Sequence, residues 1–396
     1  MKERNNFRSW RLLMLCCLAF VMLFQYAHGQ TLPSNFTRVQ VATGLSSPTA
    51  MAFTPDNRIL VCQKGGQLRV IKNGSLLSTP AISLSVNTSG ERGLIGVAVD
   101  PNFATNNYIY LHYTHTSGPH NRVSRFTLGS NDLATGETAI LDLPTLVGIY
   151  HNGGGLAFGL DGKLFVAVGE NQVGSNSQNL DNYLGKILRI NTDGSVPAGN
   201  PFTGNAARSR IWVYGLRNPF TIAVDPVSGR LLVNDVGNAT WEEINDATTG
   251  GQNFGWPTKE GMCTSGCSGF VNPLYVYATN RSDPPPNGQG CAINGGTFFN
   301  GAISNYPSTY NGKYFFLDYC GSWIDYITPV SGASRTGFGS GLSADNVGIK
   351  QGPDGNLYYL RIGNNTLYKI LYAGGTAAPI ITTQPANQVE PAGGNV

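Results

Sequence analysis

The sequence predicts an all-β protein, a six-bladed β-propeller, on three observations. Only 12% of its 396 residues are charged, and 51 are glycine, the residue that supplies the positive φ of tight turns. Apolar residues alternate with other residues over short runs, as half-buried strands require. A sequence pattern of strand, Asp-containing turn and strand recurs along the chain. Because a hairpin cannot bury both faces alone, repeated hairpins must pack around a common axis.

The repeated sequence pattern predicts where the blades lie. Asp-Gly and Asp-Asn are the residue pairs that favour the tight turn between two strands. A four-stranded blade needs about 40–50 residues, so the residues of each unit in excess of that number form loops. A pair of β-sandwiches is the alternative architecture. Five clear units lie at 49–63, 93–114, 154–170, 220–237 and 347–360, and a less regular sixth at 295–299 with 313–319.

Residues 1–29 have the features of a signal peptide. A basic start precedes the apolar run Leu12–Phe24, which is too short to span a bilayer as a stable helix. Ala27-His28-Gly29 then offers the small residues that a signal peptidase reads, so we expect cleavage before Gln30 and a secreted or periplasmic protein. A membrane anchor is the alternative. After cleavage we expect no membrane span.

Net charge excludes one class of partner. Without the four basic residues and Glu3 of the first segment, the chain's 26 basic and 23 acidic residues become 22 of each. A neutral mature chain does not attract nucleic acid or an anionic membrane through bulk charge.

The rest of the chain divides into a long domain and a short tail. We expect the propeller to occupy residues 30–372. Residues 373–396 begin with a Gly-containing linker and continue with a stretch similar to the first strand of an immunoglobulin-like module, too short to fold alone.

Five cysteines remain in the mature chain, and an exported protein can keep disulfides. Cys263 with Cys267 and Cys291 with Cys320 are plausible pairs, although sequence alone does not prove pairing. Cys62 lies in an apolar strand and is expected to be a buried thiol.

Polar residues just outside the predicted strands are the candidates for chemistry, because propeller ligands bind where loops meet at the mouth of the channel. His151 precedes three glycines and a strand, and a neutral imidazole can act as a general base. Arg217 and Asn218 precede a proline, and a guanidinium can hold a carboxylate or stabilise an oxyanion. Glu91 stands between glycines at a strand entrance.

A fourth cluster is acidic. The segment 234–245 contains Asp235, Glu242 and Glu243, and calcium prefers carboxylate and carbonyl oxygens. A solvated acidic loop is the alternative, since the spacing is not that of an EF-hand. Likewise His151 could be a turn-capping histidine, and Arg217 could form a salt bridge between blades.

Taken together and in order, these segments resemble the glucose/sorbosone dehydrogenase family, the soluble sugar dehydrogenases that depend on pyrroloquinoline quinone (PQQ). The resemblance runs from about Asn35 to Tyr372. The matching segments are GERGLIGVAVDPNFATNNYIYLHYT at 90–114, HNGGGLAFGLDGKLFVAVGE at 151–170, LGKILRINTDGSVPAGNPF at 184–202, IWVYGLRNPF at 211–220, NDVGNATWEEIND at 234–246 and GQNFGWP at 251–257.

The resemblance implies PQQ and calcium as cofactors, an aldose as substrate and an external electron acceptor. It implies that His151 is the general base for the anomeric hydroxyl, that Arg217 and Asn218 contact the quinone and polarise its oxygen, with Arg217 as a second catalytic residue, and that Glu91 lines the cofactor pocket. It further implies that the carbonyls of Gly237 and Asn238 bind a calcium ion that also holds PQQ. The residues that match a second, structural calcium region are Glu242, Glu243 and the carbonyl of Phe254.

The chain also departs from the family pattern. No arginine pair precedes the Pro353-Asp354-Gly355 turn, and Cys320 stands near the position of a lysine that holds PQQ in relatives. Lys350, Arg361 and Arg281 are candidate replacements. Two other functions therefore remain open: a propeller without PQQ that binds glycan or protein, and a calcium-dependent lactonase-type hydrolase.

Overall fold

A computed structural model describes residues 31–279, 282–283 and 288–374. The expected signal peptide and immunoglobulin-like segment lie outside these residues.

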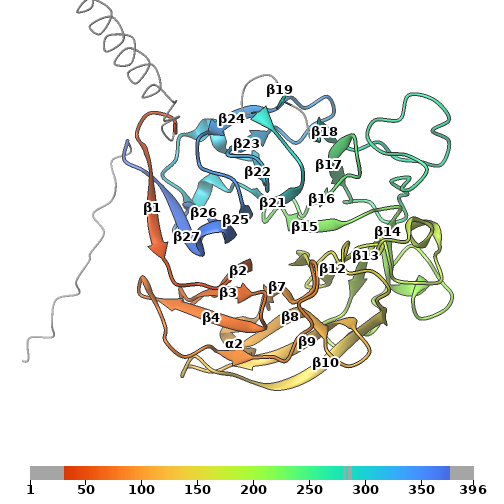
Figure 1. Cartoon of the computed structure of the whole chain (residues 1–396), viewed down its shortest axis with the longest axis horizontal. Helices are drawn as coiled ribbons and strands as arrows, with labels where there is room; N and C mark the ends of the chain where they lie inside the picture. The colour runs from red at the N-terminus through yellow and green to blue at the C-terminus, as the bar shows by residue number, and fades with distance from the viewer. Residues whose placement is uncertain (1–30, 280–281, 284–287, 375–396) are drawn as a thin grey trace, which may run out of the picture.

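Six sheets stand around a central axis, so the predicted six-bladed β-propeller is confirmed (Figure 1). The first blade contains β2 (Pro48–Phe53), β3 (Ile59–Gln63), β4 (Gln67–Lys72), β5 (Ser75–Leu76) and β6 (Ile82–Ser83), and the second β7 (Leu94–Val99), β8 (Tyr108–His115), β9 (His120–Leu128) and β10 (Ala134–Thr145). The third contains β11 (Leu156–Phe158), β12 (Leu164–Val168), β13 (Lys186–Ile190) and β14 (Ile211–Tyr214), and the fourth β15 (Pro219–Val224), β16 (Leu231–Asp235), β17 (Trp241–Asp246) and β18 (Tyr275–Ala278). The fifth contains β21 (Ile293–Phe298), β22 (Tyr314–Asp318), β23 (Ile324–Ile327) and β24 (Thr336–Gly339), and the sixth β25 (Asn346–Gln351), β26 (Leu357–Arg361), β27 (Thr366–Tyr372) and β1 (Phe36–Ala42).

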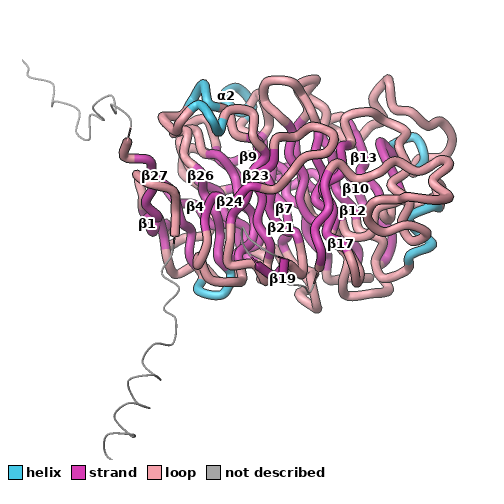
Figure 2. The backbone as a smooth tube through the Cα atoms, turned by 90° about the horizontal axis from the view of Figure 1, so that it is seen from above, coloured by secondary structure: helices cyan, strands magenta, loops and turns pink. Residues whose placement is uncertain are grey.

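The repeated sequence pattern forms the two innermost strands of every blade. The six inner strands β2, β7, β11, β15, β21 and β25 contact one another in a ring. They run from one mouth of the channel to the other (Figure 2).

Apolar side chains between neighbouring blades form the core. Each of six clusters joins two blades; Leu60 and Phe126, for example, belong to the cluster between the first and second. Fully burying one such side chain contributes about 2–3 kcal/mol. The ring is therefore held by six apolar interfaces rather than by one central core.

The first strand of the chain closes the ring. β1 pairs antiparallel with β27, from Phe36 opposite Tyr372 to Gln40 opposite Tyr368. Figure 1 shows the two ends of the domain side by side there, β1 in red and β27 in blue. Phe36 contacts the rings of Tyr306, Tyr310, Phe338 and Tyr372, at centroid distances of 4.7 to 5.7 Å. The repeats alone did not reveal this closing strand.

The two mouths differ in what the chain places there. The repeated Asp-containing turns lie at the mouth where the inner strands end, around Pro55, Asp100 and Pro353. The segments before the inner strands lie at the other mouth.

The predicted disulfides are confirmed. Cys263 pairs with Cys267 and Cys291 with Cys320, whereas Cys62 is a buried free thiol whose pKa is raised by burial.

Other elements are short. They are α2 (Phe103–Asn106), the two-stranded sheet β19 (Ser282–Asp283) with β20 (Gly288–Gln289), and 3-10 turns at Gly174–Gln178, Arg208–Arg210, Gly301–Ile303, Ser308–Tyr310 and Ile362–Asn364. Within the described ranges, no helix has the length and apolarity needed to cross a membrane.

His112 generates a prediction about acid stability. It is fully buried on β8, and neither ring nitrogen makes a hydrogen bond among the described residues. Burial lowers the pKa of His112 to about 4, below the 6.5 of an exposed histidine. Between pH 6.5 and about 4, His112 binds a proton in the unfolded chain but not in the folded protein. The free energy of unfolding therefore falls as the pH falls.

We therefore expect His112→Leu to reduce the stability loss between pH 7 and pH 5 by about 2 kcal/mol relative to the unsubstituted protein. Urea denaturation at the two pH values measures this difference. An unchanged pH dependence would show that folding does not lower the pKa of His112.

Candidate functional site

A basin of about 370 Å³ opens at the mouth where the inner strands begin. All six blades or the segments entering them line it. It is continuous with the axial channel through three shared residues, Thr49, Ile95 and Phe220. The polar residues lining the basin include Lys64, Glu91, Tyr150, Asn218, Asn294 and Tyr319.

Glu91 ties together three segments at this mouth. Its Oε2 accepts hydrogen bonds from the backbone N–H of His151 at 2.9 Å, from the N–H of Asn152 at 3.4 Å and from Asn218 Nδ2 at 3.2 Å. Asn218 Oδ1 in turn accepts from Gly153 N at 3.0 Å. Glu91 and Asn218, both predicted from the sequence as site residues, therefore lie in contact. Glu91 holds the loops before the third and fourth blades to its own loop.

His151 stands beside the basin with its ring held on one side. Its Nδ1 shares a 2.5 Å hydrogen bond with Glu170 Oε1, and the side chains are 15% and 2% exposed. Its backbone is left-handed, at a φ of 57°. With a proton on Nδ1 directed to the carboxylate, Nε2 carries a lone pair, which suits it to act as a base.

Glu170 was not among the residues predicted from sequence. The register of the hairpin could have indicated it, because Leu156 pairs with Val166 and Ala157 with Phe165. Continuing that register places Glu170 opposite Asn152, next to His151.

The three glycines that follow Asn152 are required by the packing of the backbone around them. A Cβ at Gly153 would lie 2.6 Å from the carbonyl oxygen of Ala167, and one at Gly155 would lie 3.0 Å from Ile222 N. The glycines therefore allow close approach of the backbone within the third blade and to the fourth.

Arg217 flanks the basin and is fixed from three directions. Its guanidinium donates to the carbonyl of Val236 at 3.1 Å and to Asn238 Oδ1 at 3.3 Å. It also lies over the ring of Trp256, 5.5 Å from the centroid. The buried carboxylate of Asp235 accepts from the backbone N–H groups of Arg217 and Asn218, which holds the turn.

A basic residue that the sequence did not suggest lines the basin. Lys64 donates from Nζ to the carbonyl of Gly90 at 2.6 Å. Among the suggested replacements, Lys350 lines the axial channel, Arg361 Nε donates to the carbonyl of Ala344 at 3.0 Å, and Arg281 lies outside the described residues. The basin thus has Lys64 on its wall and Arg217 at its edge.

The acidic residues of the fourth blade are buried. Burial raises the pKa of Asp235 and of Glu243; the charge of Asp235 raises the pKa of Glu243 further, and the charge of Glu242 raises that of Asp235, because like charges repel. Burial also raises the pKa of Glu242 to about 7, with a contribution from Asp318. Glu242 Oε1 has no hydrogen-bond partner among the described residues. Such carboxylates suit a cation.

The structure does not bring Glu242 and Glu243 together. They are adjacent on β17, and neighbouring strand residues point to opposite faces. Glu242 Oε2 accepts from the N–H of Gly237 and of Ile293, whereas Glu243 Oε1 accepts from Gly261 N at 2.6 Å. One calcium region built from both carboxylates, as the resemblance implied, is therefore divided between two environments.

The other predicted calcium residues lie on both sides of this strand. Gly237 follows Val236, which lines the basin, and Asn238 contacts Arg217. Phe254 is buried in the cluster between the third and fourth blades.

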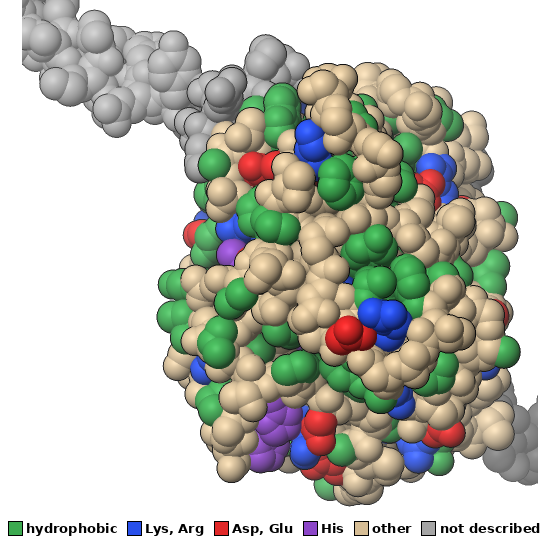
Figure 3. Space-filling model, turned by 90° about the vertical axis from the view of Figure 1, so that its right-hand side faces the viewer, with side chains coloured by type: hydrophobic (Ala, Val, Ile, Leu, Met, Phe, Trp, Pro, Cys, Tyr) green, Lys and Arg blue, Asp and Glu red, His purple; other side chains and the backbone are tan. Residues whose placement is uncertain are grey.

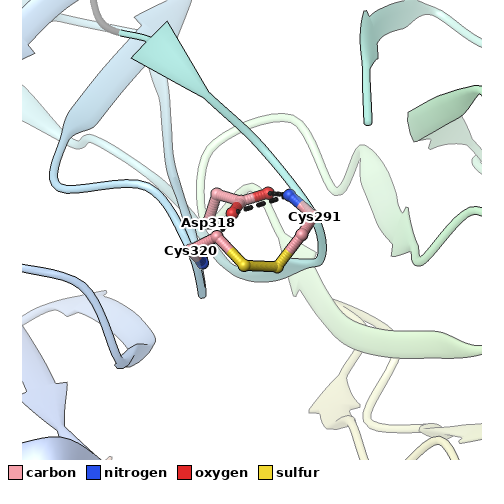
Figure 4. Close-up of side chains that lie close together, drawn as sticks. All are labelled: Cys291, Asp318 and Cys320. Atoms are coloured by element: carbon pink, nitrogen blue, oxygen red, sulfur yellow. Dashed lines mark hydrogen bonds between the residues drawn. A yellow bond between two sulfur atoms is a disulfide. The ribbon is translucent and has the colours of Figure 1, made fainter. Parts of the chain in front are cut away.

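One further group of potential metal ligands is already satisfied. Figure 4 shows Asp318 beside Cys291 and Cys320, whose sulfurs form a disulfide. Asp318 accepts a hydrogen bond from Tyr277 and several backbone N–H groups, including those of Cys291 and Cys320. This cluster braces the rim of the basin, where Ala292 and Tyr319 lie.

The surface in Figure 3 has mixed charge. Basic and acidic side chains lie interspersed on that face, with apolar side chains between them.

Comparison with known proteins places the chain in a family. The family model described as Glucose / Sorbosone dehydrogenase matches residues 45–298. The chain is 37% identical to aldose sugar dehydrogenase YliI of Escherichia coli over 221 residues, 54% of this chain and 59% of that protein. It is 30% identical to quinoprotein glucose dehydrogenase B of Acinetobacter calcoaceticus over 305 residues, 69% of this chain and 62% of that protein. Each alignment thus spans about three fifths of the relative.

A solved structure agrees with this assignment over a greater length. The PQQ-bound form of aldose sugar dehydrogenase from Streptomyces coelicolor superposes with a TM-score of 0.71 at 25% identity, covering 86% of this chain and all of that one. The chain therefore belongs to the glucose/sorbosone dehydrogenase family, as the resemblance indicated.

Proposed function

We propose that this protein oxidises an aldose at its anomeric carbon, with PQQ as the acceptor of the hydride and His151 as the general base. The observation that carries the proposal is the hydrogen bond of His151 Nδ1 to Glu170 beside the basin. Family membership and the quinoprotein relatives support the reaction class.

In this mechanism His151 Nε2 takes the proton of the anomeric hydroxyl as the C–H bond breaks and a C=O bond forms, giving a lactone. The carboxylate of Glu170 stabilises the resulting imidazolium and keeps the ring oriented. PQQ, when bound, supplies a quinone that accepts the hydride. Turnover would also require an external electron acceptor.

The residues present at the basin fit a tricarboxylate quinone. A volume of about 370 Å³ is within the range of cofactor sites, and its continuity with the channel adds depth. We assign Lys64 to a carboxylate of the cofactor and Arg217 with Asn218 to the quinone, as the resemblance implies. Lys64 supplies part of the positive charge that the chain lacks because the arginine pair and the lysine of the family pattern are absent.

We propose calcium as the second cofactor. The carbonyls of Gly237 and Asn238 lie beside the basin and would hold the ion nearest the quinone. Glu243 with the carbonyl of Phe254 would hold a structural ion, since a cation relieves the repulsion between Glu243 and Asp235. Glu242 belongs to the Gly237 side of the strand.

We also propose that the protein acts outside the cytoplasm. Two disulfides in the described chain suit an oxidising compartment, and residues 1–29 have the pattern of an export signal.

His151→Ala tests the mechanism. With PQQ, calcium, an aldose and an artificial acceptor dye, we expect kcat to fall at least 100-fold while the half-saturating PQQ concentration stays within a few-fold. His115→Ala, at the C-terminal end of β8 and outside the lining of the basin, is the matched control and should leave both values unchanged.

Dye reduction by His151→Ala at the normal rate would refute the base assignment. If no variant shows a PQQ-dependent rise in melting temperature, the binding-module alternative is favoured. Lactone hydrolysis without PQQ would favour the hydrolase.

Calcium removal tests the metal assignment. We expect EGTA to lower the melting temperature by about 5 °C, and added calcium, but not magnesium, to restore it. Glu243→Gln removes one of the repelling charges, so its melting temperature should respond much less to either treatment. An equal response of both proteins would place the calcium elsewhere.

A further inference from the structure

A single carboxylate oxygen collects four consecutive backbone donors next to the basin. Glu260 Oε1 accepts hydrogen bonds from the N–H groups of Asn238, Ala239, Thr240 and Trp241, at 2.7, 3.1, 3.2 and 3.4 Å. Successive backbone N–H groups that converge in this way form a concave site for an anion. We call residues 238–241 the amide nest.

The segment that carries Glu260 is itself anchored to the fourth blade. Gly261 N donates to the buried Glu243 Oε1 at 2.6 Å. A Cβ at Gly261 would lie 2.3 Å from Trp241 Cδ1, so the indole packs directly on this backbone. The backbone that carries Glu260 is therefore held in place, and the Glu260 side chain extends from it to the nest.

The amide nest is connected to Arg217 through the residues at its start. Val236 and Asn238 provide the two acceptors of the Arg217 guanidinium, at 3.1 and 3.3 Å. The third contact, the ring of Trp256, lies four residues before Glu260. The nest carries one of the three groups that hold the guanidinium, Val236 just before the nest carries the second, and the segment leading to Glu260 carries the third.

We propose that Glu260 is a positioning residue for Arg217: its carboxylate fills the amide nest and so fixes the loop that orients the guanidinium at the basin. The effect on cofactor binding rests on the proposed function, whereas the effect on the loop does not. Without an anion, the four N–H groups would lose their shared acceptor and turn to solvent, which releases Asn238 from its place beside Arg217. Glu260 does not itself line the basin.

Chemical rescue tests the proposal. Glu260→Ala empties the nest, and we expect the half-saturating PQQ concentration to rise about 10-fold. Formate is small enough to occupy the vacated position, so formate at tens of millimolar should restore most of the loss in Glu260→Ala. Glu260→Gln keeps an acceptor oxygen without the charge, so its loss should be smaller and should not respond to formate.

The matched control is Asp246→Ala at the opposite end of β17. It removes a carboxylate that binds Arg230 in the same blade, and neither PQQ saturation nor formate response should change. Restoration of Asp246→Ala by formate would indicate a general salt effect and overturn the proposal.

A double-mutant cycle then asks whether Glu260 acts through Arg217. Adding Glu260→Ala to Arg217→Ala should raise the half-saturating PQQ concentration no further. If Glu260→Ala has its full effect in the Arg217→Ala background, or no effect alone, the proposal is wrong.

A cofactor-free measurement separates this inference from the proposed function. In 5-fluorotryptophan-labelled protein, the Trp256 ¹⁹F resonance, assigned by its loss in Trp256→Phe, should shift in Glu260→Ala and return with formate. No further shift should occur when Arg217→Ala is already present. If PQQ binds no variant, the proposed function fails, but a formate-reversible shift still supports the positioning role, and an unmoved resonance overturns it.

Discussion

The pairing of β1 with β27 is the constraint on which the rest of the structure depends. It joins two segments more than 300 residues apart, and closing a loop of that length costs about 5 kcal/mol of chain entropy. The backbone ladder and the packing of Phe36 against four aromatic rings offset that cost. Only a closed ring places the loops of all six blades around one basin.

Within the closed ring, hydrogen bonds between side chains and backbone set the site more than ion pairs do. Glu91 joins the entrances of three blades, Asp235 holds the turn of Arg217, and Glu260 holds the amide nest. Each is a carboxylate that accepts from several N–H groups, a strong and directional arrangement. The same device thus fixes His151, Asn218 and Arg217, which come from loops far apart in sequence.

The acidic end of the fourth blade shows the opposite condition. Asp235 and Glu243 are buried close enough to repel one another, and Glu242 keeps an orphaned oxygen. A fold retains such groups at a stability cost, because a buried charge without a partner is unfavourable. A cation bound there would remove this cost, which is the reason for the proposed calcium ion.

The sequence by itself determined the local features. Period-two strands, Asp-containing turns and the order of motifs predicted six blades, two disulfides, the family and the residues Glu91, His151, Arg217 and Asn218, because each is written in a continuous segment. Tertiary structure alone decided the pairing of β1 with β27, the partnership of Glu170 with His151, the place of Lys64 in the basin and the separation of Glu242 from Glu243. These depend on which distant segments the ring brings together and on which face of a strand each side chain lies, and no single segment contains that information.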